Sequence, residues 1–216
     1  MIKTLFFDLD GTLTDSKTGI VRSVQYSLDS LGIKIKNTDD MTKFIGPPLR
    51  ESFKVLYGLD DETVEKAVEK FRERYFVTGV YENEMYPGID TMLQQQKDAG
   101  KILIVATSKV TVLANTVLSH FGLDKYFDYI SGSEMNGDRS EKSEIIQYAI
   151  EQNNITDLSG CIMIGDRKHD VTGAKTAGMK SIGVLYGYGD RNELSEAGAD
   201  YIVNDVSELS ALLFRL

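Results

Sequence analysis

The chain has 216 residues, of which 42% are hydrophobic and 26% charged, a composition typical of a globular protein with a sizeable buried core. Lys and Arg number 24 against 33 Asp and Glu, and the net charge of −9 argues against a broad basic surface for nucleic acid. The one cysteine, Cys161, excludes an internal disulfide and is predicted to be a buried core thiol in a reducing compartment.

The N-terminal segment MIKTLFFDLD begins as an apolar run but reaches a carboxylate at Asp8. The run is too short for a signal peptide or a membrane span, so we expect a cytoplasmic protein that does not bind membranes. The segment predicts a buried strand that ends at two closely spaced acids, Asp8 and Asp10.

Helical patterning without a convincing strand follows this first segment. Apolar residues recur at helical spacing over residues 20–31 and again over residues 64–75. We therefore predict an all-helical domain at residues 16–85, inserted into a main domain made of residues 1–15 and 86–216.

Short apolar runs return after the insertion, each too short for a core helix. They are KILIVATS, DYISGS, GCIMIGD, KSIGVLYG and DYIVND. One helical segment, at residues 90–99, precedes the first of these runs, and others lie between the runs, for example at residues 143–152. Strands that alternate with helices predict an α/β fold, with a parallel sheet and helices on both faces. Ligands of such sheets bind beyond the carboxyl ends of the strands.

Polar side chains collect at these predicted strand ends and helix starts. They are Asp8, Asp10, Thr107, Ser108, Lys142, Asp166 and Asp170. Each is weak evidence alone, because a strand-end Asp is often a helix N-cap and an isolated Lys is usually at the surface. Four carboxylates at one point would repel one another and a phosphate ester, so a divalent cation is expected with them. Oxygen ligands without a His or Cys cluster favour Mg²⁺.

The closely spaced acids suggest a reaction. An aspartate held against a metal ion is ionised and can attack phosphorus, which gives an aspartyl-phosphate intermediate. A second acid two residues further on could protonate the leaving oxygen and later deprotonate the attacking water. The sequence therefore predicts hydrolysis of a small phosphomonoester.

Four motifs then resemble the signature motifs of the haloacid dehalogenase superfamily, in order and spacing over essentially the whole chain. They are DLDGT at 8–12, TSK at 107–109, Lys142, and GDRKHD at 165–170. The resemblance implies a Rossmann-like catalytic core with the inserted residues 16–85 as a small helical cap. The branch it implies contains phosphoglycolate phosphatases, beta-phosphoglucomutases and some 5'-nucleotidases.

The resemblance also implies roles for the four carboxylates. Asp8 would be the nucleophile and a metal ligand. Asp10 would be the general acid and base, and its backbone carbonyl would complete the metal shell. Asp166 would bind Mg²⁺ directly, and Asp170 would bind it directly or through water.

For the phosphate, the resemblance implies that Thr107 holds an oxygen with its hydroxyl, helped by Ser108. Lys142 would neutralise the phosphate and orient Asp8, with Lys109 and Lys168 as alternative phosphate lysines.

The substrate contact implied from the cap is Arg50. The rigid loop FIGPPLRESF at 44–53 would hold its guanidinium over a second anionic or polar group of the substrate. The alternative is a surface arginine paired with Glu51 or another neighbouring acid.

Phosphoglycolate and 5'-nucleotides are the expected substrates, and a monomer or a homodimer is the expected state. A phosphomutase would use the same four motifs, so it remains open as an alternative. A non-enzymatic phospho-acceptor domain is disfavoured, because such domains are much shorter and have neither a cap nor acids like Asp166 and Asp170. Dehalogenase chemistry is disfavoured because it requires neither Asp10 nor a metal.

Overall fold

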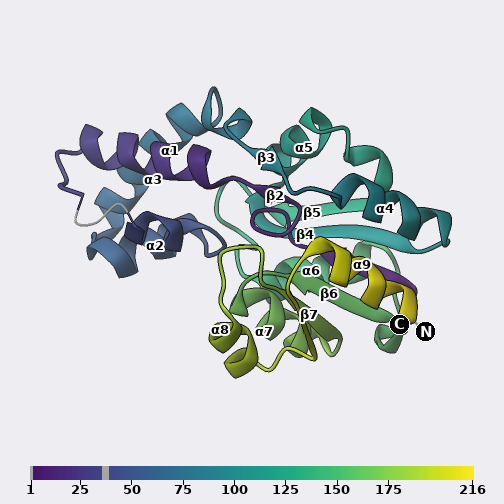
Figure 1. The fold of residues 1–216 in the computed structure, drawn as a ribbon. Coiled ribbons are helices and arrows are strands. Elements are labelled where there is room, and N and C mark those ends of the chain that lie inside the picture. The colour runs from purple at the N-terminus through teal and green to yellow at the C-terminus, as the bar shows by residue number, and fades with distance from the viewer. Residues whose placement is uncertain (1, 36–38) are drawn as a thin grey trace. The chain divides into compact units, whose positions relative to one another are not determined.

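The computed structural model describes residues 2–35 and 39–216, and the chain divides into two compact units (Figure 1). The larger unit comprises Met1–Thr14 and Met85–Leu216, and the smaller one comprises Asp15–Glu84. The boundaries predicted from the sequence lie one residue further along the chain at both junctions. Each unit is described by itself below.

The larger unit is built on a six-stranded sheet in the order β5-β4-β1-β6-β7-β8, with all neighbouring strands parallel. The strands are β1 (Thr4–Phe7), β4 (Ile102–Val110), β5 (Tyr129–Ser133), β6 (Cys161–Gly165), β7 (Lys180–Val184) and β8 (Tyr201–Val203). Each predicted apolar run forms one of these strands, and the predicted α/β fold is confirmed. Strands β4 and β5 lie on one side of β1, and β6, β7 and β8, which come later in the chain, lie on the other. The carboxyl end of β1 is therefore a topological switch point.

Helices cover both faces of this sheet. They are α4 (Ile89–Asp98), α5 (Thr111–His120), α6 (Lys142–Gln152), α7 (Lys168–Ala177), α8 (Arg191–Ala197) and α9 (Val206–Arg215), with short 3₁₀ turns η3 (Asp124–Tyr126) and η4 (Leu158–Gly160). Connections between parallel strands are right-handed. The strand order runs from β1 to β4 and β5 in one direction and then to β6, β7 and β8 in the other, so the helices before β5 and those directly after it lie on opposite faces of the sheet. Figure 1 accordingly shows α4 and α5 on one side of the strands and α6 and α7 on the other.

The core under α6 and α7 contains Phe6, Ile146, Met163 and Ala174, all inaccessible to solvent. Cys161 belongs to the same cluster and is 1% exposed, so the predicted buried thiol is confirmed. The neighbours of Phe6 along β1 point to the other face and are equally buried, which shows that both faces of the central strands are covered.

The smaller unit is helical in its described part, as predicted, apart from its two end residues. It contains α1 (Lys17–Ser30), η1 (Asp39–Phe44), α2 (Leu49–Tyr57), α3 (Asp61–Tyr75) and η2 (Gly79–Tyr81). Its ends belong to β2 (Thr14–Asp15) and β3 (Glu84–Met85), which pair in a two-stranded sheet. Helices α1 and α3 pack together, and the Ser27 hydroxyl donates to the carbonyl of Ala67 at 2.6 Å. Across both units, the described helices include none with the length and apolar character needed to cross a membrane.

Candidate active site

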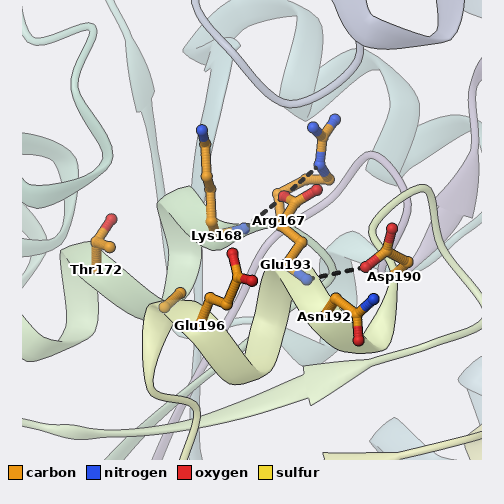
Figure 2. A pocket seen from close by; sticks show the side chains of 8 residues that line it. Arg167, Lys168, Thr172, Asp190, Asn192, Glu193 and Glu196 are labelled. Atoms are coloured by element: carbon orange, nitrogen blue, oxygen red, sulfur yellow. Dashed lines mark hydrogen bonds and ion pairs between the residues drawn. The ribbon is translucent and has the colours of Figure 1, made fainter.

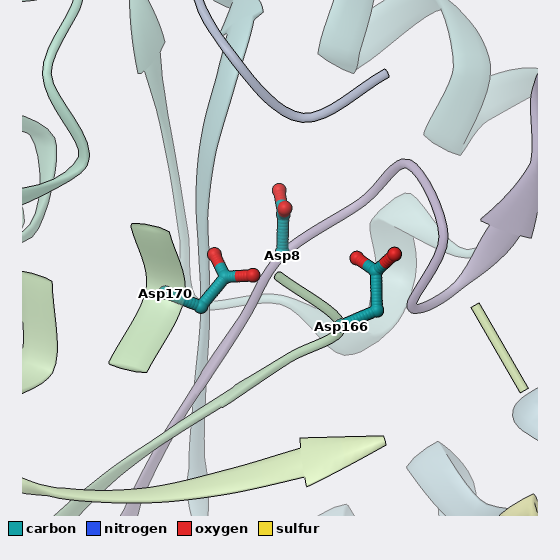
Figure 3. Close-up of side chains that lie close together, drawn as sticks. All are labelled: Asp8, Asp166 and Asp170. Carbon is teal, nitrogen blue, oxygen red and sulfur yellow. The ribbon is translucent and has the colours of Figure 1, made fainter. Parts of the chain in front are cut away.

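Three acidic side chains of the larger unit come together at the carboxyl ends of β1 and β6. Asp8 directly follows β1, Asp166 directly follows β6, and Asp170 lies in the first turn of α7. All three are buried, and one carboxylate oxygen from each lies within 4.8 Å of the other two. Figure 3 shows the three carboxylates side by side, with their oxygens directed to the same side. A group of oxygen ligands this close together can hold a hard divalent cation.

Lys142, the first residue of α6, brings a positive charge to these acids. Its Nζ lies 2.9 Å from Asp8 Oδ1 and 2.8 Å from Asp170 Oδ1, and it donates to the carbonyl of Ala106 at 3.1 Å. Burial lowers the pKa of Lys142, but the charges of Asp170 and Asp8 outweigh burial and raise the pKa above its usual value. Lys142 therefore stays protonated, and the structure places it against Asp8, whereas Lys168 is exposed.

One lysine does not balance this group of acids. Burial raises the pKa of Asp166 well above its usual value, and the charges of Asp170 and Asp8 raise it further. Burial also raises the pKa of Asp170, to about 6, although the charge of Lys142 opposes the change. Ionising all three carboxylates together thus calls for more positive charge, which a bound divalent cation would supply.

Two loops press their backbones against Asp166. A Cβ atom added to Gly11, Gly187 or Gly189 would lie closer than 3.0 Å to an atom of Asp166, a separation that real Cβ atoms do not adopt. Gly11 has in addition a φ of +85°, which only glycine tolerates easily. Gly165 has the same relation to Asp170. The acids are thus held in a cradle of glycine backbone that any larger residue would fill.

The segment 185–194, which directly follows β7, supports Asp166 in the structure. The backbone N–H of Tyr188 donates to Asp166 Oδ2 at 2.8 Å. The hydroxyl of Tyr186 donates to the carbonyl of Thr12 at 3.0 Å, and so ties this segment to the turn that follows Asp8. This supporting role was not predicted, and its signal in the sequence is the pair of glycines at 187 and 189.

Asp10 also follows β1 but is not part of the group formed by Asp8, Asp166 and Asp170. Its Oδ2 lies 2.9 Å from Nζ of Lys109, and its buried Oδ1 accepts no hydrogen bond from the part of the chain that the structure describes. Thr107 is buried in β4, and its hydroxyl oxygen accepts the backbone N–H of Lys109 at 3.3 Å. Ser108 is half-buried, and its carbonyl accepts the hydroxyl of Ser133 at 2.8 Å. The pairing of Lys109 with Asp10 was not foreseen.

Arg50 belongs to the smaller unit, in the first turn of α2. Its Nε and Nη2 bind the two carboxylate oxygens of Glu65 on α3, at 2.6 and 2.9 Å. The arginine therefore has an acidic partner within its own unit, and a contact with substrate stays a prediction.

A polar hollow lies beside α7 and α8 (Figure 2), and its lining includes none of the predicted catalytic residues. Its lining comprises Arg167, Lys168, Thr172, Asp190, Asn192, Glu193, Glu196 and Ala197. Glu193 Oε1 accepts from Nε of Arg167 at 2.9 Å and from the backbone N–H of Lys168 at 2.8 Å. The backbone N–H of Arg167 in turn donates to Asp170 Oδ2 at 3.0 Å. Glu193 therefore ties α8 to the turn that carries Asp166 and Asp170.

Comparison with known proteins identifies relatives over the whole chain. The family model of haloacid dehalogenase-like hydrolases matches residues 5–184. A 5'-nucleotidase of Pseudomonas aeruginosa is 42% identical over 209 residues, which are 97% of this chain and 94% of that protein. The tyrosine-protein kinase PtkA of Mycobacterium tuberculosis is 38% identical over 186 residues, 86% of this chain but 62% of the kinase.

Two further similarities extend this group. A phosphoglycolate phosphatase of Agrobacterium fabrum is 32% identical over 214 residues, 97% of this chain and 91% of that protein. The crystal structure of a predicted phosphatase from Clostridium acetobutylicum matches with a TM-score of 0.97 and 46% identity, and covers 100% of both chains.

Proposed function

The chain belongs to the family of haloacid dehalogenase-like hydrolases, as its motifs indicated, and we propose that it is a Mg²⁺-dependent phosphatase of a small phosphomonoester. The observation that carries the proposal is the contact of Lys142 with both Asp8 and Asp170 inside the group of three buried acids. We infer that a nucleophilic carboxylate, the cation that holds it and a metal site lie together at one edge of the sheet.

The acids fit a hard divalent ion. The donors are carboxylate oxygens, they are buried and close together, and a single lysine leaves them short of positive charge. Asp8, Asp166 and Asp170 would hold Mg²⁺, and the backbone carbonyl of Asp10 would be a further ligand. When bound, the ion supplies the positive charge that lets a phosphate dianion approach these acids.

In the first step the carboxylate of Asp8 attacks phosphorus. The backbone N–H of Leu9 at 2.7 Å and Nζ of Lys142 at 2.9 Å both contact Oδ1 of Asp8, which leaves Oδ2 for the attack. The new bond joins Asp8 to phosphorus while the bond from phosphorus to the ester oxygen breaks. Asp10 gives its proton to that leaving oxygen, and the alcohol departs.

In the second step water attacks the phosphorus of the aspartyl-phosphate. The carboxylate of Asp10 takes a proton from the water, and the bond between phosphorus and Asp8 breaks. Phosphate leaves, Asp8 is again a carboxylate, and Asp10 has regained its proton. We assign the binding of phosphate oxygens to the Thr107 hydroxyl, to Ser108 and to Lys142.

The substrate is proposed to be a small phosphorylated metabolite of the cytoplasm. A 5'-nucleotide is the first choice because the relative named 5'-nucleotidase is 42% identical, and phosphoglycolate is the second because the phosphatase named for it is 32% identical. We propose that the smaller unit, residues 15–84, is the helical cap and that its Arg50 binds a second anionic or polar group of the substrate.

The similarity to a protein named tyrosine kinase favours a second candidate, in which the phosphoryl group passes from Asp8 to an acceptor hydroxyl instead of water. A phosphomutase would differ from the phosphatase in the same respect. Both use the residues named above, so only the fate of the phosphate separates them.

Phosphate release from a panel of esters tests the proposal. The panel contains 5'-nucleotides, phosphoglycolate, sugar phosphates and p-nitrophenyl phosphate, with Mg²⁺ or with a chelator, and Asp8→Asn is the blank. We expect release that requires both Mg²⁺ and Asp8, with a loss of at least about 10³-fold in Asp8→Asn. Full activity of Asp8→Asn would refute the mechanism. Covalent labelling of Asp8 without release would instead support transfer to another acceptor.

A further inference from the structure

Strand β4 departs from regular pairing where it reaches the candidate site. Ala106 pairs with Ser131 of β5, and the next pair joins Val110 to Ser133. Between these two pairs the chain advances four residues along β4, from 106 to 110, but two residues along β5, from 131 to 133. Extra residues of this kind form a β-bulge, which turns side chains away from the direction that strand alternation would give them.

Several contacts fix the bulge in place. The Ser133 hydroxyl donates to the carbonyl of Ser108 at 2.8 Å, and the Thr111 hydroxyl donates to the carbonyl of Ser133 at 3.2 Å. A Cβ atom on Gly132 would lie closer than 3.0 Å to the carbonyl oxygen of Lys109. Glycine at position 132 of β5 therefore makes room for the backbone of Lys109. The close packing of these two strands fixes the orientation of the Lys109 backbone.

The fixed bulge directs the Lys109 side chain to Asp10. Nζ of Lys109 lies 2.9 Å from Asp10 Oδ2, and only 5% of the lysine side chain and 11% of the aspartate side chain are exposed. Burying such a pair removes two charges from water, so it is not by itself a source of stability. A buried ion pair of this kind has a clearer value in holding a reactive group in one orientation.

The two oxygens of Asp10 are thereby distinguished. Oδ2 is held by Lys109, whereas Oδ1 is buried and accepts no hydrogen bond from the described residues. Oδ1 is therefore the oxygen that can carry the proton exchanged with the leaving group and with water.

We propose that Lys109 is a positioning residue, which fixes the carboxylate of Asp10 so that Oδ1 faces the leaving oxygen of the ester. The two buried lysines then have separate roles, since Lys142 holds the nucleophile Asp8 and Lys109 holds the proton carrier Asp10. The inference rests on the proposed hydrolysis through Asp8 and Asp10.

The test compares esters whose leaving groups differ in basicity. p-Nitrophenolate leaves without a proton, whereas the alkoxide of a nucleoside or an alkyl phosphate needs one. For Lys109→Met we expect kcat/KM to fall about 100-fold on the alkyl ester and less than about threefold on p-nitrophenyl phosphate. Lys109→Arg, which keeps the charge, should recover part of the loss, and Lys175→Met on the exposed side of α7 is the control.

A double-mutant cycle sharpens the result. Asp10→Asn should show the same dependence on the leaving group, and adding Lys109→Met to it should cost little more, because the two residues act as one unit. An equal loss on all esters would overturn the inference and make Lys109 a phosphate-binding or purely structural residue.

The remaining outcomes are also decisive. A retained kcat/KM for p-nitrophenyl phosphate reports that a variant is folded. If Lys109→Met does not fold, Lys109→Arg must still show a loss of kcat/KM confined to poor leaving groups. A uniform loss in Lys109→Arg counts against the inference. If the wild-type protein hydrolyses no ester, the proposed function fails first, whereas an active enzyme with uniform losses refutes only the role of Lys109.

Discussion

Replacing Lys142 by methionine removes a cation that contacts both Asp8 and Asp170. The lysine and its two partners are at most 4% exposed in their side chains, and the contacts measure 2.9 and 2.8 Å. Breaking a buried ion pair by removing one partner costs about 3 to 5 kcal/mol, because the other charges stay buried. For a protein of this size that loss lowers Tm by on the order of 10 °C.

The loss should depend on pH. The pKa of Asp170 is already raised to about 6, chiefly by burial, and it rises further when the charge of Lys142 is removed. A carboxyl whose pKa is higher in the folded than in the unfolded state favours folding while protonated. That contribution is fully present below the unfolded pKa of about 4 and is lost as the pH rises through the folded pKa. We therefore expect Lys142→Met to be strongly destabilised at pH 8 and much less at pH 5.

Thermal unfolding followed by circular dichroism, in chelator between pH 5 and pH 8, measures this effect, and Lys175→Met on the same unit is the control. Millimolar Mg²⁺ should restore part of the stability of Lys142→Met at pH 8, because it supplies positive charge to the same carboxylates. A loss of equal size at both pH values would refute the reasoning, since it would show that the acids are not left charged and unpaired.

Two further substitutions test residues outside the acid group. Glu193→Gln should raise the Mg²⁺ concentration needed for half-maximal activity about 10-fold and leave kcat at saturating Mg²⁺ unchanged, because Glu193 holds the turn that bears Asp170. Glu196→Gln, from the same hollow, is the control. An unchanged Mg²⁺ titration of Glu193→Gln would count against a role of Glu193 in holding this turn. Arg50→Ala should reduce kcat/KM for the best natural ester about 10-fold more than for p-nitrophenyl phosphate. Equal effects of Arg50→Ala and Glu65→Ala on every ester would make this arginine a structural residue only.

The fold could be predicted because each strand is a short apolar run bounded by polar or glycine residues, and the runs alternate with helical segments. The placing of Asp8 and Asp166 directly after β1 and β6 follows from the same pattern. Their convergence needed only the general rule that parallel strands end at one edge of the sheet.

The contacts that the sequence did not reveal depend on packing between distant segments. The ion pair of Lys109 with Asp10 requires the bulge in β4, and the letters TSKV carry no sign of a bulge. The partner of Arg50 depends on which helix faces α2, and Glu65 lies on α3 rather than beside the arginine in sequence. A pattern along one segment of the sequence cannot predict contacts between side chains of distant segments.

The glycine cradle has a consequence for anyone who mutates this protein. Gly11, Gly165, Gly187 and Gly189 offer no functional group, yet a methyl group at any of them would displace Asp166 or Asp170. In a saturation mutagenesis scan of activity, substitutions at these glycines should therefore be as damaging as substitutions of the nucleophile Asp8, although the glycines take no part in the reaction. Libraries meant to broaden the range of substrates should keep the four glycines constant and diversify elsewhere.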